Sequence, residues 1–429
     1  MTGERNSPRG NLALHQLAQL RKLLGALLDS NPFYGPRLRK AGLEGELSSL
    51  DEFTGSLPLT CKEELVEDQS NDPPYGTNLT YPLEAYSRFH QTSGTSGSPL
   101  RWLDTPDSWR WMLQGWRKVF EVAAVGPEDR VLFPFSFGPF LGFWTAFDAA
   151  EDLGCLALPG GSLSSQARLR LLEENQATVV CCTPTYALRL AEVAAQVGFD
   201  LATSSVTRLI VAGEPGGSVP AVRRRISQRW GGAKVLDHHG MTEVGPVSFP
   251  NAAHPDILHI FESSYLAEIL DPTTLQPVTP GEVGELVLTT LGRLGSPLLR
   301  YRTGDLVQQS LRPAEELGHP ELALQGGLLA RADDMVVVRG VNLYPSAVER
   351  VVRGFEEVAE YRVELSTEAS LAEVRLLVEP APGVSGAKLS QQLATALRNS
   401  FQLRIPVSPV ATGSLPRFEL KAQRWVRED

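Results

Sequence analysis

A run of small and hydroxylated residues between positions 91 and 99 offers the clearest chemistry in the sequence. It reads Gln-Thr-Ser-Gly-Thr-Ser-Gly-Ser-Pro. Glycine lets the main chain approach a ligand closely, and successive backbone N–H groups with nearby hydroxyls can surround an anion. We therefore predict a loop that binds polyphosphate, and the alternative is a flexible Gly/Ser linker. The predicted binding residues are Thr92, Ser93, Gly94, Thr95, Ser96 and Gly97.

This loop differs from the G-x-x-x-x-G-K-[ST] phosphate loop, because Gly97 is followed by Ser98 and Pro99. That difference disfavours a P-loop NTPase. A second candidate segment, His-His-Gly-Met-Thr-Glu at 238–243, follows an apolar run. A carboxylate placed just past a strand and a glycine turn can hold a magnesium ion that bridges phosphates, so Glu243 is the predicted metal ligand. The alternative is a turn with an incidental surface glutamate.

A third candidate segment, Arg-Tyr-Arg-Thr-Gly-Asp-Leu at 300–306, places Asp305 in a predicted glycine turn. A carboxylate there could accept hydrogen bonds from the hydroxyls of a ribose. Taken alone, the same segment could be an ordinary turn.

Alternating apolar runs and amphipathic segments must position these groups. Short apolar runs predict strands at 130–135, 155–158, 177–182 and 208–212, with helices between them. Such alternation indicates parallel βαβ units in a sheet that is covered on both faces. An amphipathic helix is predicted at 11–28.

The pattern of predicted elements changes after Glu243, where strands follow one another without helices between them. Strands are predicted at 265–270, 284–290 and 306–309, and then a β-α-β pattern at 335–338, 346–354, 360–366, 372–379 and 385–401. We therefore expect an α/β protein with two domains. A large N-terminal domain (1–332) would contain parallel α/β sheets and a β-rich part at about 245–330, and a small mobile α+β domain would span 333–429.

Composition excludes several classes of protein. The 429 residues carry a formal charge of −10, which repels nucleic acid and anionic membrane surfaces. The sequence has no apolar stretch of the length that a membrane span needs, about 18 residues, and no signal-peptide pattern at Met1–Gly10. The four cysteines form no C-x-x-C pair, which fits a reduced cytoplasmic location.

The order and spacing of these segments resemble the adenylate-forming superfamily of acyl-CoA synthetases, luciferases and nonribosomal peptide adenylation domains. Within it, the sequence is similar to the phenylacetate-CoA ligase branch from about Leu17 to the C-terminus. The segments that carry the resemblance are 212–215 (Ala-Gly-Glu-Pro), 258–262 (Leu-His-Ile-Phe-Glu), 281–287 (Gly-Glu-Val-Gly-Glu-Leu-Val), 301–305 (Tyr-Arg-Thr-Gly-Asp) and 333–345 (Asp-Asp-Met-Val-Val-Val-Arg-Gly-Val-Asn-Leu-Tyr-Pro).

The resemblance implies a role for each matching residue. Thr92 to Gly97 would clasp the phosphates of ATP, Thr242 would lie beside the α-phosphate, and Lys421 would stabilise the adenylation transition state. Asp333 matches the hinge position of the family. The remaining implied contacts are Gly213, Glu214 and Pro215 on adenine, His239 in the place of a stacking aromatic with Gly240 and Met241 beside it, Glu243 on magnesium, Asp305 on the ribose, and Arg331 on the ribose or phosphate side.

An aromatic segment at 133–144 occupies the place where the family builds part of its acyl pocket, although ordinary core packing explains each ring as well. The predicted pocket residues are Phe135, Phe137, Gly138, Phe140 and Phe143. Leu100 stands where many relatives outside this branch carry lysine. The absence of cysteine from 249–259 argues against the cysteine-bound metal site of some relatives.

The resemblance implies an AMP-forming acid-CoA ligase that uses ATP, Mg²⁺ and coenzyme A. Its expected acid is aryl or arylacetic, and its partners are these small molecules, with neither nucleic acid nor membrane and with a possible homodimer. One alternative is an adenylating enzyme that loads a carrier protein or forms an amide. A second is a regulator that binds nucleotide without catalysis. The presence of Thr95, Glu243, Asp305 and Lys421 together argues against the regulator.

Overall fold

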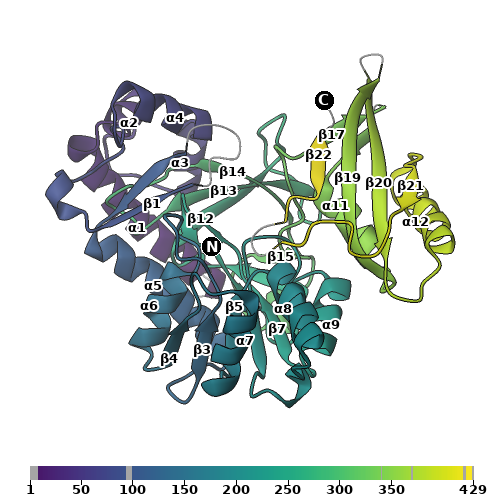
Figure 1. Ribbon diagram of the computed structural model, residues 1–429. Coiled ribbons are helices and arrows are strands. Elements are labelled where there is room, and N and C mark those ends of the chain that lie inside the picture. Colours follow the sequence, from purple (N-terminus) through teal and green to yellow (C-terminus); the bar gives the residue numbers. More distant parts are fainter. Residues whose placement is uncertain (1–7, 93–98, 340, 369–370, 419–421, 428–429) are drawn as a thin grey trace.

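The computed structural model describes residues 8–92, 99–339, 341–368, 371–418 and 422–427. A large α/β part and a smaller part near the C-terminus lie side by side (Figure 1). The predicted α/β class is confirmed. The boundary at 332/333 remains a prediction, although a separate cluster of buried apolar side chains begins at Val338.

The centre of the large part is a five-stranded parallel sheet with the order β4-β3-β5-β6-β7. Successive side chains of each strand face opposite sides, so the strands read as continuous apolar runs when both faces are buried. Val131 and Phe133 pack with α5 and α6, whereas Leu132 between them packs with α7 and α8. The elements are β3 (Arg130–Phe133), β4 (Leu156–Pro159), β5 (Val179–Cys182), β6 (Arg208–Val211), β7 (Lys234–Asp237), α5 (Pro106–Val122), α6 (Trp144–Asp152), α7 (Ser165–Glu174), α8 (Pro184–Val197) and α9 (Pro220–Arg229).

Several of these helices begin at a hydroxyl cap followed by proline. The Thr105 side chain accepts from the Ser108 N–H before α5, and Thr183 accepts from the Tyr186 N–H before α8. Proline follows each cap, where its fixed φ suits the first helical turn. These caps fix the residues at which α5 and α8 begin after the preceding strands. The predicted site residues gather at this edge of the sheet.

Two antiparallel sheets form the β-rich part. One has the order β10-β11-β15 and the other β12-β13-β14-β16. The strand predicted at 306–309 begins earlier, at Tyr301, so Asp305 lies inside a strand and the predicted glycine turn is wrong. Gly304 has φ +74° next to a register shift in the ladder, which gives the strand a local bulge where a turn was expected. The elements are β10 (Ser248–Pro250), β11 (Ile257–Ile260), β12 (Tyr265–Leu270), β13 (Val283–Thr290), β14 (Tyr301–Gln308), α10 (Ala314–Leu317), β15 (Ala323–Gln325) and β16 (Ala330–Arg331).

The N-terminal helices and a hairpin complete the large part. In the hairpin, β1 (Arg88–Gln91) pairs with β2 (Arg101–Asp104), so the predicted phosphate loop connects two antiparallel strands. The predicted helix at 11–28 is confirmed as α1 (Pro8–Ser30). The other elements are α2 (Gly35–Lys40), α3 (Leu50–Ser56), α4 (Lys62–Asn71), two short 3₁₀ turns (Leu83–Ala85 and Leu201–Thr203), β8 (Gly240–Met241) and β9 (Gly245–Pro246).

The smaller part is an α+β unit, as predicted. Its sheet has the order β21-β20-β19-β22, and α11 and α12 pack on it. Its elements are β17 (Val336–Val338), β18 (Val341–Leu343), α11 (Pro345–Arg353), β19 (Val358–Glu368), β20 (Leu371–Pro380), α12 (Gly386–Phe401), β21 (Val407–Pro409) and β22 (Trp425–Arg427).

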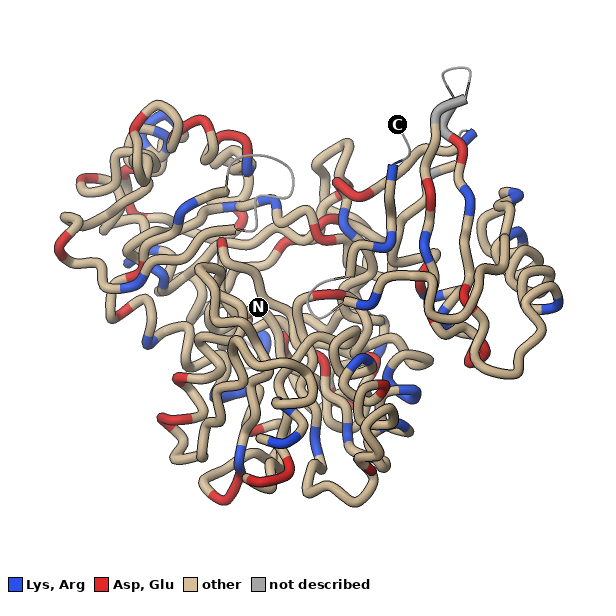
Figure 2. The backbone as a smooth tube through the Cα atoms, in the orientation of Figure 1, with Lys and Arg blue, Asp and Glu red and all other residues tan. Residues whose placement is uncertain are grey.

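Acidic and basic residues are interspersed along the chain around the parallel sheet (Figure 2). Among the described residues, no helix combines the length and the apolar character that crossing a membrane requires.

Candidate active site

Two adjoining cavities lie beyond the carboxyl ends of β5, β6 and β7, where open α/β sheets bind their ligands. The first, of about 250 Å³, lies between the large part and the C-terminal part, and we call it the nucleotide-side cavity. The second, of about 450 Å³, has aromatic walls, and we call it the aromatic cavity. Residues that line both are Gly213, His238, Gly240, Met241, Arg331 and Asp334.

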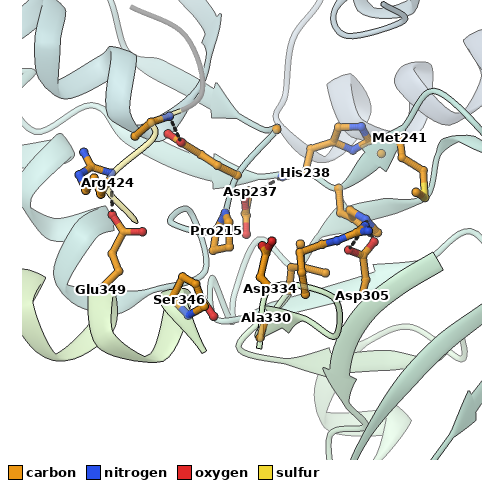
Figure 3. A pocket seen from close by; sticks show the side chains of 18 of the residues that line it. Pro215, Asp237, His238, Met241, Asp305, Ala330, Asp334, Ser346, Glu349 and Arg424 are labelled. Atoms are coloured by element: carbon orange, nitrogen blue, oxygen red, sulfur yellow. Dashed lines mark hydrogen bonds and ion pairs between the residues drawn. The ribbon is translucent and has the colours of Figure 1, made fainter. Parts of the chain in front are cut away.

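Asp305 is the buried carboxylate of the nucleotide-side cavity. It is 2% exposed, its Oδ2 lies 2.9 Å from His239 Nε2, and its Oδ1 accepts from Arg331 Nη1 at 3.1 Å. Burial opposes its ionisation, but His239 and Arg331 outweigh burial and hold the pKa of Asp305 below its usual value. The site therefore presents a fixed anionic acceptor, which suits hydroxyl donors. Figure 3 shows Asp305 on the same side of the cavity as Met241, away from Glu349 and Arg424.

The segment predicted to line adenine borders the same cavity. Gly213 has φ +92°, which only glycine adopts readily, and Pro215 also lines the wall. The Glu214 carboxylate accepts the backbone N–H of Thr185 at 2.7 Å and that of Ala422 at 3.3 Å. Glu214 therefore links the large part to the C-terminal segment that follows residues 419–421.

Two buried groups at the carboxyl end of β7, Asp237 and His238, set the charge of the cavity floor. Burial raises the pKa of Asp237 to about 6, even though Asp237 accepts the Ser218 N–H at 2.9 Å. Burial lowers the pKa of His238 to about 3, so its ring is neutral at pH 7. Its Nδ1 donates to the Ser248 carbonyl at 2.7 Å, because a carbonyl oxygen can only accept, and this leaves Nε2 as an acceptor.

The turn that carries Thr242 and Glu243 joins β8 to β9 and lines the aromatic cavity. The Thr242 hydroxyl accepts the Leu141 N–H at 3.4 Å. The Glu243 side chain is 7% exposed, and its Oε1 lies 3.6 Å from Lys62 Nζ, at the start of α4. Lys62 therefore supplies a cation opposite the predicted magnesium ligand, and the sequence analysis missed it.

The phosphate loop is described only at its base. Thr92 is buried and lines the aromatic cavity, and its hydroxyl accepts the Leu100 N–H at 3.0 Å. The predicted binding residues Ser93, Gly94, Thr95, Ser96 and Gly97 lie outside the described residues.

Aromatic rings form one wall of the larger cavity. Phe135, Phe140 and Phe143 line it together with Trp116 from α5. Phe135 packs edge-on against Phe140 and Phe143, with centroids 5.2 and 5.4 Å apart. A Cβ on Gly142, which has φ +38°, would lie 2.1 Å from Phe135, so the packing requires glycine there.

The other two predicted pocket residues lie outside this wall. Phe137 packs behind it against Trp144, with centroids 4.8 Å apart, and the Gly138 carbonyl accepts from Trp144 Nε1 at 3.0 Å. Phe137 has φ +48°, in the left-handed region that residues other than glycine seldom adopt, and its ring also packs on Phe147 of α6, with centroids 5.3 Å apart.

The C-terminal part closes the nucleotide-side cavity. Ser346 and Glu349 from α11 line it, as do Ala422 and Arg424, and Arg424 Nη1 binds Glu349 Oε1 at 3.1 Å (Figure 3). Lys421 lies outside the described residues. Asp333, at the predicted hinge, accepts Arg331 Nε and Nη2 at 2.9 and 3.0 Å.

Among the described residues, no group of three or more His, Cys, Asp or Glu side chains could hold a metal ion on its own. A magnesium ion that is bound through substrate phosphates needs only one or two carboxylates from the protein. Glu243 fits that donor set, because its carboxylate lines the cavity beside Thr92 and has only Lys62 as an ion-pair partner among the described residues.

Sequence reasoning found groups in recognisable local motifs and missed groups that reach the site from elsewhere. Trp116, Asp237 and Tyr186 also line the cavities. Asp237 had a local signal, since it ends an apolar strand immediately before the 238–243 segment. Lys62 had none, because its only link to the site is a contact across 181 positions of the chain, between residues 62 and 243.

Comparisons with known proteins agree with this geometry. The family model "AMP-binding enzyme" matches residues 89–292, and "AMP-binding enzyme C-terminal domain" matches residues 340–428. The chain is 30% identical to a phenylacetate-coenzyme A ligase of Pseudomonas putida, over 96% of this chain and 93% of the relative. It is 31% identical to one of Thermus thermophilus, over 87% and 82%.

A solved 2-hydroxyisobutyryl-CoA ligase is also similar, at 27% identity over 96% of this chain and 89% of that chain. In its postadenylation state with 2-HIB-AMP, that protein matches with a TM-score of 0.89. In its thioesterification state with 2-HIB-AMP and CoA, the TM-score is 0.72, over 99% of this chain and 91% of that chain. The two parts of the present chain are therefore arranged more as in the former state.

Proposed function

The chain belongs to the AMP-binding enzymes, in the phenylacetate-CoA ligase-like branch, and is an ATP-dependent acid-CoA ligase that forms an acyl-AMP intermediate; we propose that its acid is aryl or arylacetic. One observation carries this proposal. The cavity beside Glu243 has a volume of about 450 Å³, and Trp116, Phe135, Phe140 and Phe143 line it. A planar ring buries well against such rings, which favour edge-on and offset contacts.

The proposed reaction begins with attack of the acid's carboxylate on the α-phosphorus of ATP, with pyrophosphate leaving. The acid would lie in the aromatic cavity and the adenosine in the nucleotide-side cavity, which share Gly213, Gly240 and Arg331. Asp305 would accept the ribose hydroxyls. Its ionised state supports this role, because His239 and Arg331 keep the pKa of Asp305 low.

Charge on the phosphates would be met by groups from three segments. Glu243 would hold Mg²⁺, which neutralises phosphate charge when it is bound. Lys62 Nζ, 3.6 Å from Glu243, would face the same phosphates and compensate for the missing lysine at Leu100. We assign Lys421 to the transition state, where a positioned cation stabilises developing charge. The neighbouring residue Ala422 lines the nucleotide-side cavity, which supports this assignment.

The second half of the proposed reaction transfers the acyl group to the thiol of coenzyme A. We propose that the C-terminal part rotates about Asp333 between the two halves, which would withdraw Lys421 and admit the thiol. The higher similarity to a postadenylation state than to a thioesterification state supports two arrangements of one chain. A homodimer is part of the proposal, and sedimentation of the purified protein would test it.

Acid-dependent release of pyrophosphate from ATP tests the proposal. The purified chain would be assayed with arylacetic, aryl and short aliphatic acids, with and without Mg²⁺ and coenzyme A. We expect release with aromatic acids, dependence on Mg²⁺, and acyl-CoA as the product when coenzyme A is present. Release with aliphatic acids alone would overturn the proposed substrate class. Formation of acyl-AMP without any acyl-CoA, in the presence of coenzyme A, would overturn coenzyme A as the acyl acceptor.

A further inference from the structure

Arg293 is a fully buried cation that lines neither of the two cavities among the described residues, yet it binds the segment that carries two predicted catalytic groups. Its side chain and that of Asp104 are both 0% exposed. Nε and Nη2 donate to the two Asp104 carboxylate oxygens at 2.7 and 2.6 Å. Nη1 donates to the backbone carbonyls of Thr242 and Glu243 at 3.0 and 2.7 Å.

These contacts join three segments that are distant in the sequence. Asp104 is the last residue of β2, the strand that leaves the phosphate loop. Thr242 and Glu243 lie in the turn between β8 and β9, and Arg293 follows β13. One guanidinium therefore fixes the far end of the strand that follows the predicted phosphate loop relative to the turn with the proposed magnesium ligand.

The chemistry of this contact requires arginine. The planar guanidinium can bind a carboxylate through two parallel bonds and still donate to carbonyls, whereas a lysine ammonium is a single point charge. A buried ion pair is a costly way to hold a fold, because an apolar pair of similar volume often serves as well. The directed bonds of Arg293 therefore point to a requirement for geometry.

We propose that Arg293 is a positioning residue for the adenylation half-reaction, an inference that rests on the proposed roles of Thr242 and Glu243. By holding both carbonyls of the turn, Arg293 orients the Glu243 carboxylate and the Thr242 hydroxyl toward the ATP that the phosphate loop binds. Groups that are preorganised in this way stabilise charge without reorganisation during the reaction. The thiol-transfer half-reaction no longer involves the β- and γ-phosphates, so it should depend on Arg293 far less.

The test compares Arg293→Lys with Arg300→Lys. Arg300 makes a similar bidentate pair with Glu268, at 2.9 and 2.7 Å, and donates to the Leu57 carbonyl. These groups line neither cavity, so Arg300→Lys controls for the loss of a bidentate pair in the β-rich part. Both variants would be assayed for pyrophosphate release over a range of Mg²⁺ concentrations, and for acyl-CoA formation from supplied acyl-AMP.

We expect Arg293→Lys to lower kcat/KM for adenylation about 100-fold, the cost of a misplacement of about 1 Å. The Mg²⁺ concentration for half-maximal rate should also rise several-fold. Thiol transfer should stay within about 3-fold of wild type, and Arg300→Lys should leave both half-reactions within the same range. An equal loss in both half-reactions, or an unchanged Mg²⁺ dependence, would overturn the inference.

If Arg293→Lys does not fold, Asp104→Asn provides the second variant. It keeps the shape of the side chain, but its amide nitrogen cannot accept, so one of the two bonds from Arg293 and the countercharge are lost while the bonds from Nη1 to the turn can remain. The same split between the half-reactions is expected, at a smaller magnitude of about 10-fold. An inactive wild type over the whole acid panel would count against the proposed function, whereas an active wild type with an unaffected Asp104→Asn variant would count against Arg293 alone.

Discussion

The two cavities differ in which parts of the chain build them. Most residues of the aromatic cavity come from the large part, and its rings pack edge-on against one another. The nucleotide-side cavity takes Pro345, Ser346, Glu349 and Arg424 from the C-terminal part, and ion pairs hold its wall. From residue 333 onward, the C-terminal part contributes only Asp333 and Asp334 to the described lining of the aromatic cavity, so the proposed acid site depends less on where that part lies than the proposed nucleotide site does.

The two cavities should therefore respond differently when the C-terminal part rotates relative to the large part. Apolar packing within one domain is insensitive to domain rotation, because every contact moves as one body. The Arg424–Glu349 pair lies within the C-terminal part, whereas the hydrogen bond from Ala422 to Glu214 joins the two parts and would be remade under the proposed rotation. Changes in the aromatic cavity should therefore affect the choice of acid, and changes at the C-terminal part should affect the half-reactions unequally.

The largest effect is expected from Lys421→Ala. Removal of a cation that acts only during adenylation should lower acyl-AMP formation roughly 10²- to 10³-fold. Thiol transfer from supplied acyl-AMP should remain largely intact. Single-turnover measurements of both halves provide the test, with Lys388→Ala, an exposed lysine of α12, as the matched control. If both half-reactions survive Lys421→Ala, the assigned role is wrong.

Lys62→Met should have the next largest effect. Lys62 lines the aromatic cavity from the large part, and its partner Glu243 is nearly buried. Loss of this cation should raise the KM for Mg·ATP about 10- to 30-fold, as expected when one charge-assisted contact to phosphate is lost. The KM for the acid should change far less. A larger change in the KM for the acid than in that for Mg·ATP would place Lys62 in the acid's site.

How much of this site could be predicted from the sequence depends on how each residue reaches it. The strands of the parallel sheet were predictable because burial on both faces leaves continuous apolar runs, as in Val179–Cys182. Asp305 was found through its motif, although the predicted turn is a bulged strand. Lys62 and Arg293 were not found, because their significance lies in contacts across many residues that no local pattern encodes.

The aromatic segment shows the same limit at short range. Its richness in phenylalanine was visible, but which rings line the cavity depends on contacts with other segments. Phe137 packs on Trp144 and Phe147 of α6, while Phe135 and Phe140 line the cavity. Neighbouring side chains of one residue type therefore have different surroundings.

Phe140→Ala tests the independence of the aromatic cavity. Phe140 packs 5.2 Å from Phe135 and lines the cavity, so its removal should raise the KM for an aromatic acid about 10-fold. The KM for ATP should be unchanged. Phe137→Leu, behind the wall, serves as the control and should alter the KM for the acid little. An equal rise in both KM values in Phe140→Ala would show that the cavities are not separable.

The smallest effect, on stability alone, is expected from Glu360→Gln. Burial raises the pKa of Glu360, but Arg353 and Arg424 outweigh burial and lower it to about 2. A carboxyl with a depressed pKa stabilises the fold above its unfolded pKa, near 4.5, and this stability is lost as the pH falls toward 2. Glu360→Gln should therefore lower the free energy of unfolding at pH 7 by on the order of 3 kcal/mol.

Denaturant titrations at pH 7 and pH 3 provide the measurement. The destabilisation by Glu360→Gln should shrink at pH 3. Glu373→Gln, which breaks a half-exposed pair with Arg339, should cost less than about 1 kcal/mol at either pH. A cost for Glu360→Gln that does not depend on pH would mean that lost packing, rather than lost charge, explains it.

The carboxylate of Glu214 contacts both parts of the chain, so it can couple ligand binding in the cavity to the position of the C-terminal part. It borders the nucleotide-side cavity and accepts N–H groups from both Thr185 and Ala422. A ligand that binds one arrangement of the parts more tightly than the other shifts their population, and the population shifts the ligand's apparent affinity by the same factor. If nucleotide binds this cavity and the C-terminal part rotates as proposed, nucleotide affinity and the position of that part are two measures of one coupling free energy, which Glu214→Gln would change.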